Sequence, residues 1–335
     1  MPVLIVTTEK SGLDKYSQEI AKRLDVKKVE SRRYLSLIEA YRLTRIIQEQ
    51  KDIVHLTNQN FARYAFFLKT PFIVTVHDLV RTYFRFGKEQ VTERILLKLD
   101  IRYIKRASHI IAVSQNTRND LIKYLKIPID RISVIYNGVD HSIFKPYDVK
   151  LLDRPYILYV GSERPRKNLG RLFEAFTKLK TEFPELKLVK VGPSGRHKRF
   201  RRDTIRKLDS LGIAQDVIFV NYTSELVLAY YYSSAALLAY PSLYEGFGFP
   251  PLEAMACGCP VVTSNTSSLP EVVGEAGIMV NPYDTDSLAQ AMRQVLTDDK
   301  LRDEIVRKGL EQAKKFSWER AAMETMEVYE KVGGT

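Results

Sequence analysis

Two glutamates stand on either side of a turn rich in glycine and proline. The order is Glu245-Gly-Phe-Gly-Phe-Pro-Pro-Leu-Glu253, after an apolar run at 235–239. Glycines let a backbone approach a ligand closely, and a helix N-terminus presents N–H groups to an anion. Two carboxylates around such a turn would suit a ligand that carries both phosphate and hydroxyl groups. The alternative is a buried strand-to-helix turn with two solvated glutamates.

Three more side chains could take part in that chemistry. Arg166 and Lys167 follow an apolar run at 156–160, where two cations could neutralise a diphosphate. His77 follows the run 72–76 and could form a hydrogen bond or handle a proton. Each signal is weak alone, because surface loops contain many Arg-Lys pairs and a histidine can simply cap a strand.

Apolar runs of strand length alternate with segments of helical period along the whole chain. The runs lie at 3–6, 53–56, 72–76, 110–113, 132–135, 156–160, 186–191, 217–220, 235–239 and 261–262. The main helical segments lie at 15–24, 35–50, 90–106, 117–125 and 169–180. This alternation predicts parallel sheets with helices on both faces, in which ligands bind beyond the carboxyl ends of strands. The polar segment 147–155 predicts a boundary between domains at 1–148 and 149–315.

Composition and cysteine usage narrow the class of protein. Hydrophobic residues make up 45% of the 335 residues, and no run approaches a membrane-spanning length. The N-terminus lacks a basic leader, so we expect a cytoplasmic protein. Cys257 and Cys259 are too close for an unstrained disulfide and have no nearby histidine, so we expect no metal site.

The positive charge is concentrated in the first half. Residues 1–150 contain 27 Lys and Arg against 16 Asp and Glu, a balance of +11, whereas 151–335 contain 25 against 24, a balance of +1. The first half therefore predicts an acidic partner, such as a membrane surface, a phosphorylated acceptor or a nucleic acid, unless the charge serves solubility alone. Within it, the segment 81–88 interleaves cations with aromatics, and we expect it to be exposed. In the helix that follows, four side chains are expected in the core: Ile95, Leu96, Leu99 and Tyr103.

The stretch around Glu245 and Glu253 resembles the signature of retaining family 4 glycosyltransferases of the GT-B fold. Four other stretches are similar to that family: Thr75-Val-His-Asp-Leu79, Tyr136-Asn-Gly-Val-Asp140, Tyr159-Val-Gly-Ser-Glu-Arg-Pro-Arg-Lys-Asn-Leu169 and Leu269-Pro-Glu-Val-Val-Gly-Glu-Ala-Gly277. Because the matches run in the expected order, the resemblance covers essentially the whole chain. It implies two Rossmann-like, doubly wound α/β domains that face across a cleft. It also implies that a C-terminal helix at 316–335 crosses back to the first domain.

The resemblance gives each matched residue an expected role. Glu253 would hold the ribose hydroxyls of a nucleotide-diphosphate sugar, and Glu245 would contact the donor sugar. Arg166 and Lys167 would bind the diphosphate, and His77 would reach the transferred sugar. The catalytic residues would then be His77, Glu245, Arg166 and Lys167. The other implied donor contacts are Gly12, Gly161, Gly192, Tyr222, Gly246, Phe247, Gly248 and Leu252. Gly12 departs from the family pattern, because its loop has fewer small residues than usual.

The expected function is transfer of a hexose from a UDP- or GDP-sugar to an acceptor hydroxyl, on a glycan or a lipid-linked saccharide. The motif places no Asp or Glu as a nucleophile, because Glu245 and Glu253 are expected to bind the donor, and this favours a front-face, retaining reaction in which the leaving phosphate takes the acceptor proton. No metal cofactor is expected, since Arg166 and Lys167 can supply the positive charge. A GT-B phosphorylase or a sugar-phosphate-type synthase stays open as an alternative. Nucleic-acid binding would not explain the two glutamates, and a nicotinamide enzyme would need a third glycine where Pro251 stands.

Overall fold

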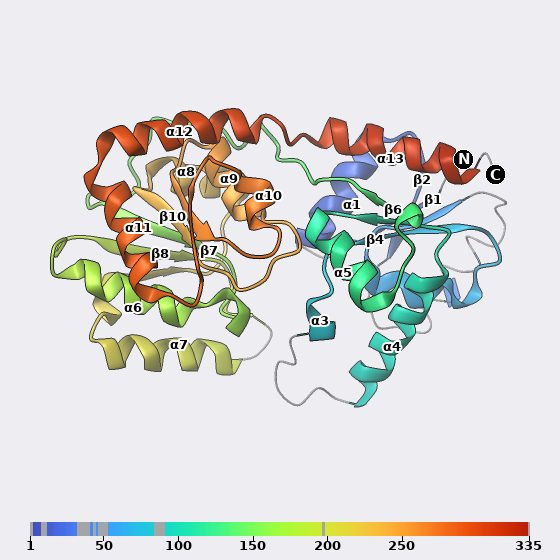
Figure 1. The fold of residues 1–335 in the computed structure, drawn as a ribbon, viewed down its shortest axis with the longest axis horizontal. Coiled ribbons are helices and arrows are strands. Elements are labelled where there is room, and N and C mark those ends of the chain that lie inside the picture. The colour runs from blue at the N-terminus through green and yellow to red at the C-terminus, as the bar shows by residue number, and fades with distance from the viewer. Residues whose placement is uncertain are drawn as a thin grey trace. The chain divides into compact units, whose positions relative to one another are not determined.

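The computed structural model describes residues 3–7, 12–31, 41, 42, 45, 53–83, 91–195 and 198–333. The chain divides into two compact units. Unit 1 comprises residues 1–138 and 317–335, and unit 2 comprises residues 139–316 (Figure 1). The described part of each unit contains one six-stranded sheet in which neighbouring strands run parallel. The predicted pair of doubly wound α/β domains is therefore confirmed.

The sheet of unit 1 has the strand order β2-β1-β3-β4-β5-β6. Its strands are β1 (Val3–Thr7), β2 (Lys27–Ser31), β3 (Val54–Leu56), β4 (Phe72–Val76), β5 (His109–Ala112) and β6 (Ile132–Val134). Every residue of β3, β4 and β5 is buried, as expected for central parallel strands covered on both faces. The sequence did not predict β2, because this edge strand is mostly polar.

Helices lie on both faces of that sheet (Figure 1). They are α1 (Gly12–Arg23), α3 (Val80–Tyr83), α4 (Val91–Arg106), α5 (Gln115–Leu125) and α13 (Trp318–Gly333), with 3-10 helices η1 (Gln59–Phe67) and η2 (Ile129–Arg131). Helix α5 begins where the Ser114 hydroxyl accepts a hydrogen bond from the Thr117 N–H, and it ends at Lys126 in a left-handed conformation. Trp318 at the start of α13 is fully buried and its ring faces Tyr16 of α1.

One prediction for α4 is wrong. Tyr103 is buried as expected, but the side chains of Ile95 and Leu99 are 54% and 36% exposed. Apolar residues lie on more than one side of this helix, so their spacing alone does not show which side faces the core. The core-facing side is the one that carries Asp100, Tyr103 and Ile104. Of the cation-aromatic segment at 81–88, residues 84–88 lie outside the described residues, as does most of the predicted helix at 35–50.

The sheet of unit 2 has the strand order β12-β11-β10-β7-β8-β9. Its strands are β7 (Tyr156–Val160), β8 (Lys187–Val191), β9 (Val217–Val220), β10 (Leu237–Tyr240), β11 (Val261–Ser264) and β12 (Ile278–Val280). The chain moves outward from β7 to β9, returns to the other side of β7 with β10, and then moves outward again to β12. The order therefore reverses between β7 and β10, and such a reversal opens a crevice for ligands at the carboxyl ends of the two strands.

The connections of unit 2 are mostly helical. They are η3 (Pro165–Lys167), α6 (Leu169–Lys180), α7 (Lys198–Leu211), η4 (Ala214–Asp216), α8 (Glu225–Ser234), α9 (Phe249–Ala256), α10 (Leu269–Val273), α11 (Thr285–Thr297) and α12 (Asp299–Ala313). Helix α6 buries a stripe of large apolar residues that includes Leu172, Phe173 and Phe176, which fixes η3 above the end of β7.

The two units divide earlier in the chain than the predicted boundary at 148. Residues from Val139 onward belong to unit 2 because they pack there: Phe144 is buried with its ring against Tyr232 of α8, and the Tyr147 N–H donates to Ser233. The chain passes between the units a second time after Phe316.

Candidate active site

The candidate site of unit 2 lies where the strand order reverses. Strands β7 and β10 are hydrogen-bonded neighbours, so the segments that leave their carboxyl ends start side by side. The segment after β7 contains Arg166 and Lys167 within η3, and the segment after β10 contains Glu245. The Leu243 N–H donates to the Arg166 carbonyl at 2.8 Å, which joins the two segments directly.

Glu245 forms ion pairs with both cations. Its Oε2 lies 2.9 Å from Nη1 of Arg166, and its Oε1 lies 2.6 Å from Nζ of Lys167. The same Arg166 nitrogen donates to the Tyr244 carbonyl at 2.7 Å. Glu245 and Lys167 are buried. The structure thus brings together three of the predicted catalytic residues.

Burial and charge together set the ionisation of this cluster. Burial acts to raise the pKa of Glu245, but Arg166 and Lys167 outweigh that effect and lower the pKa to about 2. Burial lowers the pKa of Lys167 to about 8, and the Glu245 carboxylate opposes that shift. At neutral pH the cluster therefore contains one carboxylate and two cations, a net positive charge at the carboxyl ends of β7 and β10.

Hydroxyl groups hold the Glu245 carboxylate in place. Ser242 donates to Oε1 at 2.6 Å and Tyr240 donates to the same oxygen at 3.0 Å. The Glu245 N–H donates to the Ser267 hydroxyl, and the Ser268 hydroxyl donates to the Glu245 carbonyl. These supports were not predicted from the sequence. Tyr240 and Ser242 belong to the same motif, whereas the two serines after β11 gave no local signal.

The turn at 246–248 leads into α9 through a backbone that requires glycine. Gly248 has φ +130°, and a Cβ there would approach Leu269 to 3.1 Å. Phe247 is buried among Phe249 and Phe316, so its ring packs in the core rather than facing a ligand. Leu252 is also fully buried, and its N–H donates to the Gly248 carbonyl. The side chains of Phe247 and Leu252 therefore pack in the core, and the contact between a ligand and the backbone N–H groups of the turn stays a prediction.

Glu253 has a different environment from Glu245. It lies in α9 and is buried, and its Oε2 accepts a hydrogen bond from Tyr232 of α8 at 3.1 Å. Burial, followed by the nearby Glu253 carboxylate, raises the pKa of Tyr232 well above its usual value. The tyrosine therefore stays a donor, and the two glutamates of the motif have separate sets of partners.

Two predicted glycines lie at the adjacent carboxyl ends of β7 and β8. The Gly161 N–H donates to the Val191 carbonyl, and the Gly192 N–H donates to the Val220 carbonyl. Gly192 has φ +117°, and a Cβ there would approach the Gly161 carbonyl oxygen to 2.9 Å. Only glycine lets these backbones approach so closely. Tyr222, just beyond β9, is 73% exposed.

A buried ion-pair network lies below these glycines and was not predicted from sequence. Lys190 of β8 is fully buried, with Nζ 3.1 Å from Oε1 of Glu163 and 3.0 Å from the Pro193 carbonyl. Arg201 of α7 approaches the same carboxylate at 2.6 Å. Burial acts to raise the pKa of Glu163, but the two cations outweigh it and lower that pKa. The network ties α7 and the turn after β8 to the segment that leads to Arg166.

In unit 1, His77 lies at the end of β4 and is buried. Its Nε2 is 2.9 Å from the Thr57 carbonyl, which can only accept, so this nitrogen carries the proton. The backbone N–H of His77 donates to Oε1 of Gln59, and the His77 and Tyr16 rings lie edge to face with their centroids 5.0 Å apart. Gly12 is the first residue of α1, and residues 8–11 before it lie outside the described residues.

Behind His77, a chain of buried hydrogen bonds reaches the C-terminal helix. Tyr16 and His55 both contact the Thr75 hydroxyl, at 3.0 Å and 2.7 Å, and the other ring nitrogen of His55 lies 2.6 Å from the Tyr329 hydroxyl. Burial lowers the pKa of His55 to about 3, so this histidine is neutral. The network fixes β4, and with it the backbone of His77, against α13.

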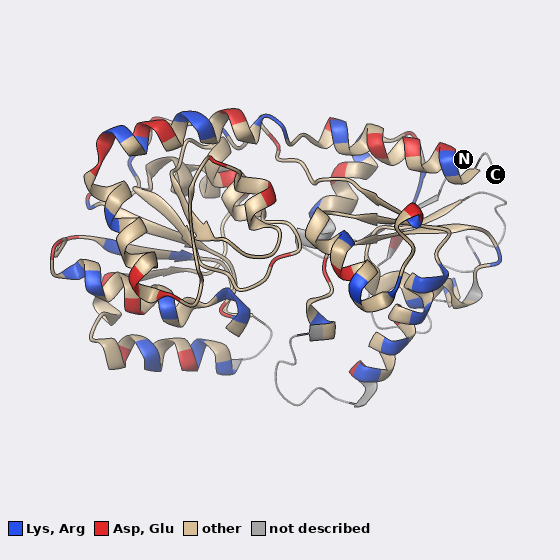
Figure 2. Ribbon diagram, in the orientation of Figure 1, with Lys and Arg blue, Asp and Glu red and all other residues tan. Residues whose placement is uncertain are grey.

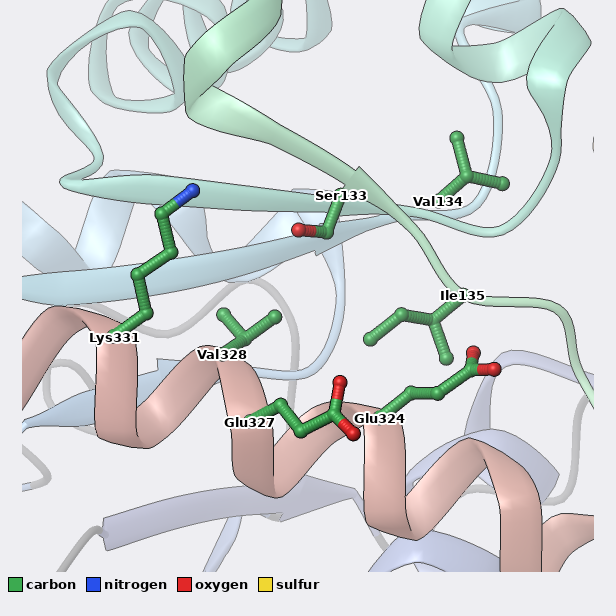
Figure 3. Close-up of a pocket in the computed structure, with 7 residues that line it drawn as sticks. All are labelled: Ser133, Val134, Ile135, Glu324, Glu327, Val328 and Lys331. Atoms are coloured by element: carbon green, nitrogen blue, oxygen red, sulfur yellow. The ribbon is translucent and has the colours of Figure 1, made fainter.

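The cavity shown in Figure 3 is separate from all of these residues. It is a groove of about 350 Å³ between the end of β6 and α13 in unit 1. Ser133, Val134 and Ile135 line one side, and Glu324, Glu327, Val328 and Lys331 line the other. None of the predicted site residues contributes to it.

The sheet of unit 2 is doubly wound and has a cationic cluster at its reversal point, an arrangement that suits a phosphorylated ligand. Residues 2–143 match the family described as glycosyltransferase family 4, and residues 144–312 match the family described as glycosyl transferases group 1. The chain belongs to the family 4, group 1 glycosyltransferases. It is therefore a transferase enzyme of the GT-B fold, as the sequence motifs predicted.

One relative agrees with this membership, and two solved structures share the fold. The O-antigen chain mannosyltransferase B of Escherichia coli is 33% identical over 326 residues, which cover 89% of this chain and 81% of that protein. Two solved structures share the fold: sucrose-phosphate synthase from Thermosynechococcus elongatus (TM-score 0.82, 21% identity, 99% of each chain) and Anabaena HepE in complex with UDP and glucose (TM-score 0.82, 18% identity, 98% of each chain).

Two features are absent from the residues that the structure describes. No group of three or more His, Cys, Asp or Glu side chains there is arranged to hold a metal ion. Within the same residues, no helix is long and apolar enough to cross a bilayer.

Proposed function

We propose that this enzyme transfers a mannosyl-type hexose from a nucleotide-diphosphate sugar to a hydroxyl group of a glycan or lipid-linked saccharide. The observation that carries the proposal is the buried cluster of Glu245 with Arg166 and Lys167 at the reversal point of unit 2. The sugar is suggested by the relative from Escherichia coli, a mannosyltransferase of O-antigen chains. A UDP-type donor is suggested by the HepE complex, whereas GDP has the same diphosphate and fits the same cations.

In the proposed reaction, the bond between the anomeric carbon and the diphosphate oxygen breaks, and the acceptor oxygen forms a bond to that carbon on the same face. The leaving phosphate takes the acceptor proton. Arg166 and Lys167 stabilise the negative charge that grows on the diphosphate, and removing one such donor typically costs ~3–4 kcal/mol of transition-state stabilisation. With two cations fixed at the leaving group, the reaction as proposed uses no metal ion.

The remaining roles follow from the environments of the side chains. Glu253, held by Tyr232, would accept hydrogen bonds from the ribose hydroxyls. Glu245 and the N–H groups of the turn at 246–248 would contact the donor sugar. Gly161 and Gly192 leave room for the nucleotide backbone, and Tyr222 would lie beside the base. In unit 1, His77 would contact the transferred sugar and Gly12 the phosphates. Cytoplasmic residence is part of the proposal.

The test begins with a thermal-shift screen of nucleotide-sugars, because a ligand that binds the folded state raises its melting temperature. We expect GDP-mannose or a UDP-hexose to stabilise the protein. NMR of the first transfer product should show the anomeric configuration of the donor. An inverted linkage would overturn the retaining reaction, and phosphorolysis of a glycan without nucleotide-sugar turnover would favour a phosphorylase.

Variants test the assigned residues. Lys167→Ala and Glu253→Ala should abolish transfer while the protein stays folded. The matched controls are Lys178→Ala and Glu182→Ala, which change exposed ion-pairing residues of the same unit and should leave transfer unchanged. Wild-type turnover in Lys167→Ala or Glu253→Ala would remove that residue from the proposed site.

A further inference from the structure

Helix α4 of unit 1 presents an outer face that combines cations with large aliphatic side chains. The exposed positions follow a helical period and form one continuous side: Arg94, Ile95, Lys98, Leu99, Arg102, Lys105 and Arg106. Figure 2 shows Lys and Arg residues, coloured blue, along α4. No acidic residue of the helix is exposed, because Glu93 is half-buried and Asp100 is buried. We call these seven residues the outer face of α4.

The inner side of α4 explains why the outer face has a single sign of charge. Asp100 points toward η1, where its Oδ1 accepts from Nε of Arg63 at 2.8 Å and from the Arg63 N–H at 3.1 Å. Tyr103 and Ile104 beside it are buried in the core of unit 1. The helix is therefore anchored on one side, and its only fully buried acid is already neutralised by an internal partner.

The cations of the outer face have no acidic partners in the part of the chain that the structure describes. Helix α7 of unit 2 has a similar proportion of arginine and lysine but a different arrangement. There Asp203 lies between Arg199 and Arg206 and is within 4 Å of both. Helix α7 is thus a mixed solvated surface, whereas the outer face of α4 keeps five positive charges available to an external anion.

Apolar groups extend this face beyond what solubility requires. Ile95 is 54% exposed and Leu99 is 36% exposed, in the middle of the cations. Phe66 of η1 is 63% exposed, and its ring meets the edge of Tyr103, one helical turn from Leu99. Exposure of such side chains to water is unfavourable, and burying each against a partner would contribute as much free energy as burying an apolar side chain in a protein core.

We propose that the outer face of α4 binds the surface of an anionic lipid bilayer. The five cations would meet lipid phosphates, and Ile95, Leu99 and Phe66 would enter the boundary between headgroups and acyl chains, as in interfacial helices. A single-stranded nucleic acid fits less well, because its bases stack on exposed aromatic rings, and Phe66 is the one aromatic among the three exposed apolar side chains named above, the other two being the aliphatic Ile95 and Leu99. The inference rests on unit 1 alone and does not depend on the donor or the reaction.

The first experiment measures binding of the full chain to vesicles of phosphatidylcholine, with and without phosphatidylglycerol. We expect binding only to the anionic vesicles. A cation near such a surface contributes about fivefold in affinity, so Arg94→Gln/Lys98→Gln/Arg102→Gln should weaken binding by about 100-fold. The control Arg199→Gln/Arg202→Gln/Arg206→Gln removes the same charge from α7 and should keep the wild-type affinity. Equal weakening in both variants, or no binding by the wild type, would overturn the proposal.

The second experiment separates a bilayer from other polyanions. Cys257 and Cys259 are buried, so Ile95→Cys can be labelled selectively with a polarity-sensitive dye. The emission of the dye should shift toward that of an apolar environment on anionic vesicles and should stay unchanged with single-stranded RNA. Leu99→Ser should weaken vesicle binding in high salt, where the electrostatic contribution is screened. A dye that responds to RNA but not to vesicles would assign the face to nucleic acid instead.

Discussion

Replacing Glu245 by glutamine tests whether the buried charge cluster behaves as the structure indicates. The change keeps the shape of the side chain and removes its charge, so Arg166 and Lys167 would face a neutral amide. Both ion pairs are short, 2.9 Å and 2.6 Å, and all three side chains are about nine-tenths buried. Removing one partner of a buried ion pair costs ~3–5 kcal/mol, because the other charge stays buried without compensation.

The expected loss is large enough to measure by calorimetry. For a domain of this size, 1 kcal/mol corresponds to about 2–4 °C, so the unfolding transition of unit 2 should fall by roughly 6–20 °C. Glu182→Gln is the matched control in the same unit. Glu182 pairs with Arg293 through two hydrogen bonds of 2.7 Å and 2.9 Å, but both side chains are exposed, and such a pair contributes ~0–1 kcal/mol.

A diphosphate should partly replace the missing carboxylate. UDP or GDP should therefore raise the melting temperature of Glu245→Gln by more than it raises that of the wild type. Removing one cation as well, in Glu245→Gln/Lys167→Met, should recover part of the lost stability. If Glu245→Gln and Glu182→Gln unfold at the same temperature, the buried cluster does not stabilise unit 2, and the expected loss of stability in Glu245→Gln is refuted.

Three other variants probe the supports of the two units. The pKa of His55 is about 3 in the folded state and 6.5 in the unfolded state, so between these pH values only the unfolded state binds the proton. Urea titrations should therefore show that the free energy of unfolding falls by about 1.4 kcal/mol for each pH unit below 6.5. His55→Gln should show a weaker dependence on pH, and the same dependence as in the wild type would contradict this prediction. Lys190→Met leaves Glu163 buried beside Arg201 only and should cost ~3 kcal/mol in unit 2, whereas an unchanged denaturation midpoint would mean that the network is neutral. Gly192→Ala should weaken nucleotide binding because its Cβ would meet the Gly161 carbonyl at 2.9 Å, while Gly170→Ala in α6, with open space around it, should bind normally.

The sequence predicted the parts of this protein whose signals are local. Buried strands such as β4 and β7 are continuous apolar runs, and the motif around Glu245 keeps its residues within a few positions of each other. The contact of Glu245 with Arg166 and Lys167 was expected from the resemblance to the family and not from the spacing of the residues, because 78 positions separate Lys167 from Glu245.

The features that were missed depend on contacts between distant segments. Strand β2 is polar because it lies at an edge, so neighbouring strands rather than its own sequence define it. The partners of His55 come from Thr75 and from Tyr329, 274 positions away. The exposed side of α4 was misassigned because apolar residues occur around more than half of that helix, and only the packing of η1 decides which of them are buried.

The double passage of the chain between the units affects the order in which the protein can fold during synthesis. Residues 139–316 are contiguous and leave the ribosome as one block, whereas unit 1 needs both ends of the chain. Its core contains Trp318, and its buried hydrogen-bond network includes Tyr329, so unit 1 is incomplete until the last helix has emerged. At ~5–20 residues per second, β1 would wait roughly 10–40 s while unit 2 is translated. The domain that is synthesised first is thus the one that finishes folding last.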